Sequence, residues 1–251
     1  MKNTIRRGFL FEAKKLSFLA VLVVFIAGGV FAQNREDPNP DSDFTVDRAG
    51  NTITGYNGQD PRVIFPSHIN GRPITAIGNA AFRNNKIIRE VAISREIISI
   101  GNDAFAGSTL RWIRFDGGVR NIGDRAFANT NLQDFVSNWP GGVRKIPNGL
   151  FRSTDLRRGL VIPEGVEEIG NDAFRGTQIT SVTLPRTINR IGNYAFSGCT
   201  QLTTVTIPSS VTSIIFGTAT FGSTSSGDLA RAPLNDASKR ALTDRGHNGR
   251  W

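Results

Sequence analysis

A six-residue phrase recurs along most of this chain and restricts the folds that it can adopt. The clearest copy, residues 191–196, reads Ile-Gly-Asn-Tyr-Ala-Phe, and its closing phenylalanine recurs every 22 to 25 residues. The copies, of which the fourth and seventh are worn, are residues 77–82, 100–105, 122–127, 146–151, 169–174, 191–196 and 216–221. Seven copies at a nearly fixed spacing predict a repeat architecture in which each copy belongs to one coil.

The residues between two phrases predict how one coil is built. Val205 and Ile207 alternate with Thr204 and Thr206, which is the pattern of a short strand with one buried face. Pro208 lacks an N–H and ends that strand. The glycine of the phrase permits a tight turn, the Asn or Asp after it is expected to cap a short helical turn, and the phenylalanines are expected to form a row of core rings. The predicted fold is a leucine-rich-repeat solenoid of about seven coils with short β-strands, turns and short helical turns, capped at both ends.

The first 32 residues have the pattern of a secretory signal peptide. A basic start precedes the apolar run 16–31, and Val30 and Ala32 lie at the spacing before a signal-peptidase cut. Cleavage is predicted between Ala32 and Gln33. The apolar run is also close to the shortest length for a spanning helix, so an uncleaved membrane anchor is the alternative. No other segment is apolar enough to span a bilayer, so no stable membrane span is expected after cleavage.

The rest of the chain divides into four parts. Residues 33–43 are polar, carry two prolines and predict a linker. Residues 44–76 hold short alternating stretches and predict an N-terminal cap, because the end of a solenoid must cover its apolar face. Residues 77–221 are the predicted solenoid. Residues 222–251 predict a C-terminal cap and tail, with a short helix over 234–242 that docks on the last coil or, as the lesser alternative, recognises a partner.

The charge and the cysteine content exclude some classes of function. Residues 1–32 hold five of the 30 basic and one of the 21 acidic residues, so cleavage lowers the net charge from +9 to +5. That charge is ordinary, and export argues against a nucleic-acid partner; an acidic polysaccharide or protein partner and a merely solubilising charge both fit it. Cys199 is the one cysteine, and neither histidine, His68 or His247, lies at the equivalent place in a neighbouring coil to act as its base. Cys199 is therefore predicted to be an inert core residue.

The repeat as a whole resembles a known family. Two stretches carry the resemblance: residues 202–214 together with the six-residue phrase, and Phe-Ser-Gly-Cys-Thr at 196–200. Both are similar to the BspA-type, or treponema-type, leucine-rich repeat of bacterial surface proteins. The resemblance covers residues 44–221. The sequence lacks the asparagine ladder of eukaryotic-type repeats, which fits this type of repeat. Coils 135–142, 146–151 and 216–221 depart from it and are expected to be irregular; the first carries an exposed-looking tryptophan. The resemblance implies an exported protein that binds host matrix proteins or partner bacteria, without catalytic residues.

Residues that point outward from the predicted strands repeat in register and form the candidate binding surface. Aligning the strands on Val205 and Ile207 gives the candidate residues Trp112, Arg114, Asp134, Ser181, Thr183, Thr204 and Thr206. Trp112 beside Arg114 is the most binding-like pair, because exposed Trp and Arg are enriched at interface hot spots. A tryptophan that only covers the neighbouring strand is the alternative. A second outward row, including Arg144, Lys145, Glu167 and Glu168, has mixed signs and predicts a solvated face.

Two hypotheses of function remain after an enzyme is rejected. No carboxylate pair recurs with a histidine, and neither metal-ligand spacing nor a phosphate-binding loop occurs, so we expect no enzyme, no cofactor and no metal. The first hypothesis is an exported, adhesin-like module, secreted or at the cell surface, that binds a protein or glycan macromolecule through its strand face. The alternative is a periplasmic structural or scaffolding protein of the cell envelope.

Overall fold

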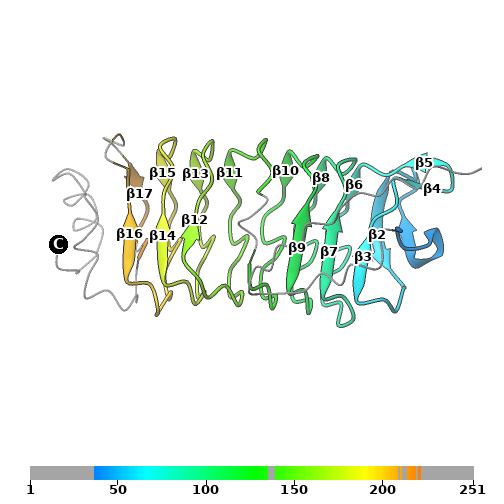
Figure 1. The fold of residues 1–251 in the computed structure, drawn as a ribbon, viewed down its shortest axis with the longest axis horizontal. Coiled ribbons are helices and arrows are strands. Elements are labelled where there is room, and N and C mark those ends of the chain that lie inside the picture. The colour runs from blue at the N-terminus through cyan, green and yellow to red at the C-terminus, as the bar shows by residue number, and fades with distance from the viewer. Residues whose placement is uncertain (1–36, 135–138, 209, 211–213, 219, 222–251) are drawn as a thin grey trace, which may run out of the picture. The chain divides into compact units, whose positions relative to one another are not determined.

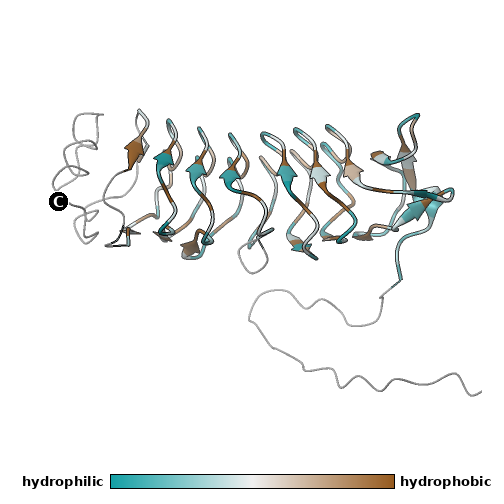
Figure 2. Cartoon of the chain, turned by 90° about the horizontal axis from the view of Figure 1, so that it is seen from above, coloured by the Kyte–Doolittle hydropathy of each residue, from teal (hydrophilic) through white to brown (hydrophobic). Residues whose placement is uncertain are grey.

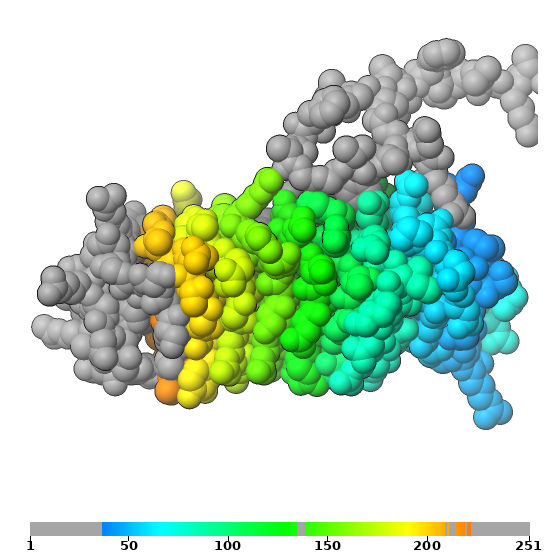
Figure 3. Space-filling model, turned by 90° about the horizontal axis from the view of Figure 1, so that it is seen from below, coloured from blue at the N-terminus to red at the C-terminus, as the bar shows by residue number. Residues whose placement is uncertain are grey.

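The described chain is a stack of coils in sequence order. The computed structural model describes residues 37–134, 139–208, 210, 214–218 and 220–221. The predicted signal peptide and C-terminal cap lie outside this range. Most described coils add one short strand to each of two parallel ladders, as Figure 1 shows, and the described coils form successive colour bands packed against one another in Figure 3. The predicted solenoid is confirmed.

The first ladder, called the strand ladder, contains the strands predicted from the alternating residues. Its members are β3 (Arg62–Ile64), β7 (Glu90–Ile93), β9 (Trp112–Phe115), β12 (Leu160–Val161), β14 (Ser181–Thr183) and β16 (Thr204–Thr206). The strands of the second ladder come later in each coil, after the turn at which the chain returns to the core. Its members are β6 (Ala76–Ile77), β8 (Ser99–Ile100), β10 (Asn121–Ile122), β11 (Lys145–Ile146), β13 (Glu168–Ile169), β15 (Arg190–Ile191) and β17 (Ile215–Phe216).

The phenylalanines that close the phrase form one column of rings through the core. Each of the seven is at most 2% exposed. Consecutive ring centroids lie 4.9 to 5.9 Å apart, and the ring planes are nearly parallel, within 3 to 19°. The members are Phe82, Phe105, Phe127, Phe151, Phe174, Phe196 and Phe221. The predicted row of rings is confirmed.

The phrase itself forms a turn with left-handed backbone, and the predicted short helical turns are wrong. Apart from a 3-10 helix at Asp41–Asp43 (η1), the described residues contain no helix. The residue after the Asn or Asp has φ near +55° in most copies, as at Asp172 and Tyr194, which costs about 1–2 kcal/mol for a residue with a side chain. Each such residue donates its N–H to the next coil, for example Tyr194 to the Thr218 carbonyl at 2.9 Å. The hydrogen bonds between coils therefore hold a conformation that one isolated coil would not prefer.

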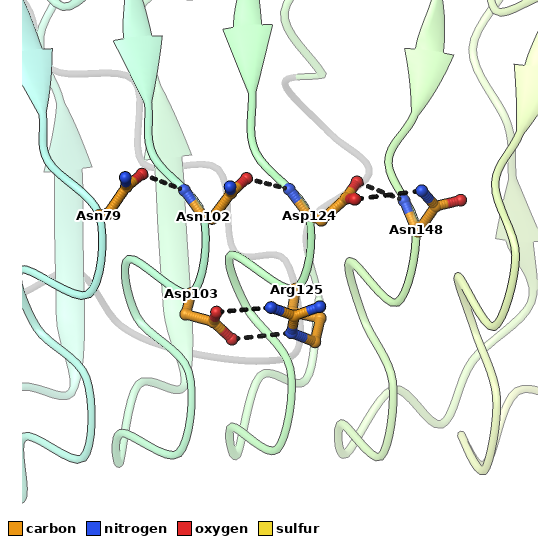
Figure 4. Close-up of polar contacts among 6 residues, drawn as sticks. All are labelled: Asn79, Asn102, Asp103, Asp124, Arg125 and Asn148. Atoms are coloured by element: carbon orange, nitrogen blue, oxygen red, sulfur yellow. Dashed lines mark hydrogen bonds and ion pairs between the residues drawn. The ribbon is translucent and has the colours of Figure 1, made fainter.

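The Asn or Asp of the phrase joins neighbouring coils through its side chain. Each side-chain oxygen accepts a hydrogen bond, at 2.8 to 3.0 Å, from the backbone N–H of the equivalent residue in the next coil. Figure 4 shows the first four members of this Asn/Asp ladder, which consists of Asn79, Asn102, Asp124, Asn148, Asn171 and Asn193. The sequence lacks the eukaryotic-type ladder, but a ladder of side-chain oxygens exists at this other position. The predicted helix-capping role of these residues is therefore wrong.

Replacing Asn171 with alanine should lower the free energy of unfolding by about 0.5–1.5 kcal/mol, because the Asn193 N–H loses an intramolecular acceptor at 2.8 Å and bonds to water instead. Urea denaturation measures the change. Asn171→Asp keeps an acceptor oxygen and should lose clearly less stability than the alanine variant. Equal losses in the two variants would contradict a role for that oxygen.

The phrase glycine allows a close approach between coils, and one coil lacks it. Six phrase glycines, such as Gly170 and Gly192, donate their N–H groups to the isoleucine carbonyl of the preceding coil at 2.7 to 2.8 Å. Pro147 takes this position in the fourth copy and has no N–H to donate to Ile122. The described strands β10 and β11 are accordingly not paired. The predicted irregular coil thus interrupts the second ladder at β10 and β11, while its Asp134 still pairs with Trp112 of β9.

Contacts from the turns keep the stack joined across this interruption. Arg125 and Phe127 donate their N–H groups to the Asn148 and Leu150 carbonyls at 2.9 and 3.1 Å. The Phe127 and Phe151 rings are 5.9 Å apart, the widest of the consecutive spacings. Trp139, expected to be exposed, is half-buried; its ring lies 6.3 Å from that of Phe151, and it donates a hydrogen bond to the Val143 carbonyl at 3.2 Å.

The N-terminal end begins earlier than the predicted cap boundary at residue 44. Strands β1 (Phe44–Val46) and β2 (Thr52–Tyr56) pair antiparallel, and β2 pairs in parallel with β6. A hairpin of β4 (His68–Ile69) and β5 (Arg72–Pro73) follows β3. Asn39, inside the predicted linker, is buried; its backbone N–H donates to the Ile64 carbonyl and its side chain accepts from the Ile64 N–H, both at 2.9 Å. Residues 39–43 therefore belong to the packed end, because Asn39 satisfies the outer edge of β3.

Candidate functional site

The outward residues of the strand ladder, called the strand face, lie in register as predicted. In the first coils Arg62, Glu90, Trp112 and Asp134 form one row, the last through an isolated bridge to Trp112. Ser181 pairs with Thr204, and Thr183 pairs with Thr206. The alignment of strands taken from the sequence therefore agrees with each of these pairings. Val136, the next outward position two residues after Asp134, lies outside the described residues.

The strand face falls into two chemically different halves, which meet between Asp134 and Gly159. The first half contains Trp112, Arg114 and Asp134, and the second contains the hydroxyl residues Ser181, Thr183, Thr204 and Thr206. The structure thus brings the candidate residues together as two groups and not as one continuous row. Between the groups lies a shallow depression of about 20 Å³, lined by Asp134, Arg158 and Gly159 among others. That volume has room for about one water molecule, so it is not a small-molecule pocket.

In the first half, Trp112 is half-buried and is flanked by charged side chains. Its register neighbours are Glu90 on one side and Asp134 on the other. Arg114, two residues along β9, is exposed and forms an ion pair with Asp116 at 2.9 Å. Ala92, in register with Arg114, is 7% exposed and so offers little surface. A half-exposed tryptophan beside an exposed arginine is the composition of an interface hot spot.

In the second half, the strand face carries no charge on the described outward positions of β12, β14 and β16. Val161 is 55% exposed and lies in register with Thr183. Gly159 precedes β12, and a side chain there would collide with the Ser181 hydroxyl, since a Cβ would lie 2.6 Å from that oxygen. This half is a flat surface of hydroxyl and aliphatic groups.

The second ladder, by contrast, satisfies its own charges. Arg144 pairs with Glu167 at 2.6 Å, and Glu168 lies between Lys145 at 3.0 Å and Arg190 at 3.5 Å. Opposite charges therefore alternate from coil to coil, and such exposed pairs contribute little to stability. The ladder ends on β17, where Ile215 is exposed; Figure 2 shows the change from hydrophilic β13 and β15 to hydrophobic β17. The mixed signs noted in the sequence thus arise from pairing between neighbouring coils.

The turn side also pairs its charges locally. Arg125 donates two hydrogen bonds to the carboxylate of Asp103, at 2.8 and 3.0 Å, as Figure 4 shows. These bonds hold the pKa of Asp103 below its ordinary value. Arg175 pairs with Asp172 at 2.9 Å and lies 5.6 Å from the centre of the Tyr194 ring. These groups join neighbouring coils and show no arrangement for acid–base chemistry.

The chemistry-bearing residues named from the sequence do not form a reactive site. Cys199 is buried, its thiol donates to the Phe174 carbonyl at 3.1 Å, and burial raises its pKa. The predicted core thiol is confirmed. In the described ranges no group of three His, Cys, Asp or Glu side chains is placed to hold a metal ion. No helix within those ranges has the length and apolar character needed to cross a membrane.

Sequence reasoning missed two arginines beside the strand face. Arg89 and Arg111 directly precede β7 and β9, both are exposed, and Arg111 donates its backbone N–H to the Arg89 carbonyl at 2.8 Å. They are 22 residues apart, one repeat period, so the signal was present in the sequence. Both arginines lie before their strands, where the alternation of buried and outward residues does not identify exposed positions.

Comparison with known proteins agrees with this fold. The chain is similar to the leucine-rich-repeat protein TpLRR of T. pallidum, with 26% identity, a TM-score of 0.63, and 85% of this chain and 98% of that chain covered. It also matches a leucine-rich cell surface protein of Faecalibacterium prausnitzii A2-165, with 25% identity, a TM-score of 0.46, and coverage of 70% of this chain and 56% of that one. No curated protein matches the chain.

A family model covers most of the repeats. The model of the BspA type leucine rich repeat region matches residues 75–178 and 144–226, with six copies. These ranges span more than half of the chain. Such repeats are typically non-enzymatic protein-interaction modules, often of surface or exported proteins, and no catalytic family is indicated. The phrase, the two parallel ladders and the matched repeats together place this chain in the BspA-type leucine-rich-repeat family.

Proposed function

We propose that this chain is an exported, adhesin-like module that binds a macromolecule outside the cell through its strand face. The observation that carries the proposal is the strand face itself, where half-exposed Trp112 lies in register between Glu90 and Asp134 and next to exposed Arg114. The second ladder has the same period, but its charges pair between coils. Family membership supports a surface or exported location.

The two halves of the strand face suggest how a partner is held. The first half offers an aromatic anchor and charged groups, which supply affinity at hot spots. The second offers Thr and Ser hydroxyls at regular spacing around exposed Val161, which suits a flat, polar contact with a protein or glycan. The seven candidate residues, Trp112, Arg114, Asp134, Ser181, Thr183, Thr204 and Thr206, therefore belong to one proposed surface with an anchoring half and an accommodating half.

Replacing both Trp112 and Arg114 with alanine should weaken partner binding by roughly 30-fold or more, the effect of losing a hot spot of at least about 2 kcal/mol. Stability should change by less than about 1 kcal/mol, since neither side chain belongs to the phenylalanine column. The measurement uses a photoreactive benzoylphenylalanine in place of Thr204, irradiated in the cells that make the protein. The yield of covalent adduct reports binding, and the double variant should lose most of it.

A matched probe in place of Asn189, exposed before the second ladder, is the positional control. The proposal expects adducts from position 204 and few from position 189. Adducts from position 189 alone, or an adduct yield at position 204 that the folded double variant keeps, would refute the strand face as the binding surface.

A further inference from the structure

The position before each strand of the strand ladder forms a row that carries basic residues and no acidic ones. Backbone hydrogen bonds join its first members, because Arg111 donates to the Arg89 carbonyl and Gln133 donates to the Arg111 carbonyl. After the interruption the equivalent residue is Arg158, which precedes Gly159, and Thr180 and Thr203 complete the row. We call Arg89, Arg111 and Arg158 the arginine edge.

Two members of the arginine edge have the same charge in neighbouring coils. Equivalent residues of adjacent coils are separated by about 4.8 Å, the spacing of paired strands. Like charges that face each other across a ladder are destabilising. Neither the Arg89 nor the Arg111 side chain forms an ion pair or hydrogen bond with any residue that the structure describes. The second ladder places Lys145, Glu168 and Arg190 in the same geometry and alternates their signs.

This contrast distinguishes the arginine edge from the charged row of the second ladder. At Lys145, Glu168 and Arg190 of the second ladder, the charges in register neutralise each other. At Arg89 and Arg111, one residue before Glu90 and Trp112, they do not, and both arginine side chains are exposed. A guanidinium group binds a carboxylate through two parallel hydrogen bonds, which are charge-assisted and therefore strong.

The charges around the edge also indicate the class of partner. Glu90, Asp116 and Asp134 lie on the same face, so the surface is not uniformly positive. A dense polyanion, such as a nucleic acid or a highly sulfated glycan, would meet these carboxylates along its whole length. A protein segment can place its own carboxylates at Arg89 and Arg111 and an apolar side chain at Trp112.

We infer that Arg89 and Arg111 bind the carboxylates of an acidic protein segment that lies along the strand face. This inference rests on the proposed function and specifies the chemistry of its partner. The segment in question carries Asp or Glu side chains near an apolar residue, and Trp112 packs against the apolar residue.

Selection from a random dodecapeptide library displayed on phage tests the inference without knowledge of the natural partner. Peptides retained by the wild-type chain should be enriched in Asp and Glu. The variant R89S/R111S should lose that enrichment and bind the best selected peptide at least about tenfold more weakly, since two charge-assisted hydrogen-bonding groups are removed.

The matched control is R83S/R152S, which removes the same charge from two exposed arginines that follow Phe82 and Phe151 on the turn side. This variant should keep the enrichment. Any of three results would overturn the inference: a wild-type pool without acidic enrichment, an enrichment that survives in R89S/R111S, or equal losses in both variants. The inference would also be overturned if heparin alone showed the same binding as the selected peptides.

The selection is performed on purified protein, so its result does not depend on where the protein is located. If the Thr204 probe yields adducts in cells but the peptide pool is not acidic, the arginine edge is wrong and the strand-face proposal stands. If acidic peptides are selected but no adduct forms in cells, the edge has the inferred chemistry and the proposed function is wrong.

Discussion

Replacing Phe174 with alanine should lower the free energy of unfolding by about 3–5 kcal/mol, the cost of emptying a well-packed aromatic site. Phe174 is fully buried, and its ring lies between those of Phe151 and Phe196 at 5.5 and 5.3 Å. Removing it leaves a cavity and breaks two aromatic contacts at once. Coils in a solenoid contact only their neighbours, so the loss weakens the boundaries on both sides. Urea denaturation followed by circular dichroism measures the change.

Ile215→Ala is the control for this variant, because Ile215 is a large apolar residue that is 55% exposed. Its loss should cost less than about 1 kcal/mol, as surface substitutions usually do. Phe174→Leu, which keeps much of the volume, should lie between the two. A Phe174→Ala variant as stable as Ile215→Ala would contradict the ring column as the main source of core stability.

Replacing Gly192 with alanine should cost about 3 kcal/mol or more, at the upper end for overpacking. A Cβ at this position would lie 2.6 Å from both the backbone nitrogen and the Oδ1 of Asn171, and 2.7 Å from the Gly170 carbonyl carbon. These are mostly backbone atoms, and relieving the collision means separating two coils. Such a separation also stretches the hydrogen bond from the Gly192 N–H to the Ile169 carbonyl, now 2.7 Å.

Gly141→Ala is the matched glycine variant, because a Cβ there meets nothing within 4 Å and no left-handed backbone is required. Its stability should be unchanged or higher by up to about 1 kcal/mol, since alanine restricts the unfolded chain. Differential scanning calorimetry on both variants separates the two effects. Similar midpoints for Gly192→Ala and Gly141→Ala would show that the phrase glycine is not chosen for close approach.

The parts of the fold that depend on repetition could be predicted from the sequence. Phe82 to Phe221 recur at one period, and residues at one position of a repeat stack in space, so the ring column follows from the spacing. The register of Ser181 with Thr204 follows in the same way. These predictions needed no knowledge of one coil's exact path.

The parts that depend on contacts between coils could not be predicted from one repeat. An Asn such as Asn171 after a glycine can cap a helical turn or bond to the next coil, and both uses satisfy the same side chain. The left-handed backbone at Tyr194 is unfavourable in isolation and is held by the Thr218 carbonyl of the following coil. The burial of Trp139 and Asn39 likewise depends on Phe151 and Ile64, which are distant in the sequence.

The candidate site was predictable in its position but not in its division. Pro147 is visible in the sequence, yet its consequence, that β10 and β11 are unpaired, depends on how neighbouring coils pack. The change along the strand face from Trp112 and Asp134 to Ser181 and Thr204 lies one coil further on. Arg89 and Arg111 show the period but lie just outside the strand, where alternation no longer identifies outward residues.

The location of the strand face in the cell tests the proposed function most directly. Lys86 and Lys145 are exposed, on the turn side and on the second ladder. Intact cells that make the protein are treated with an amine-reactive polyethylene glycol too large to cross an outer membrane, and lysed cells are treated in parallel. A binding module at the cell surface should show the same gel shift in both samples, while a cytoplasmic control protein shifts only after lysis. A shift of this protein that appears only after lysis would contradict surface binding and favour a scaffold inside the envelope.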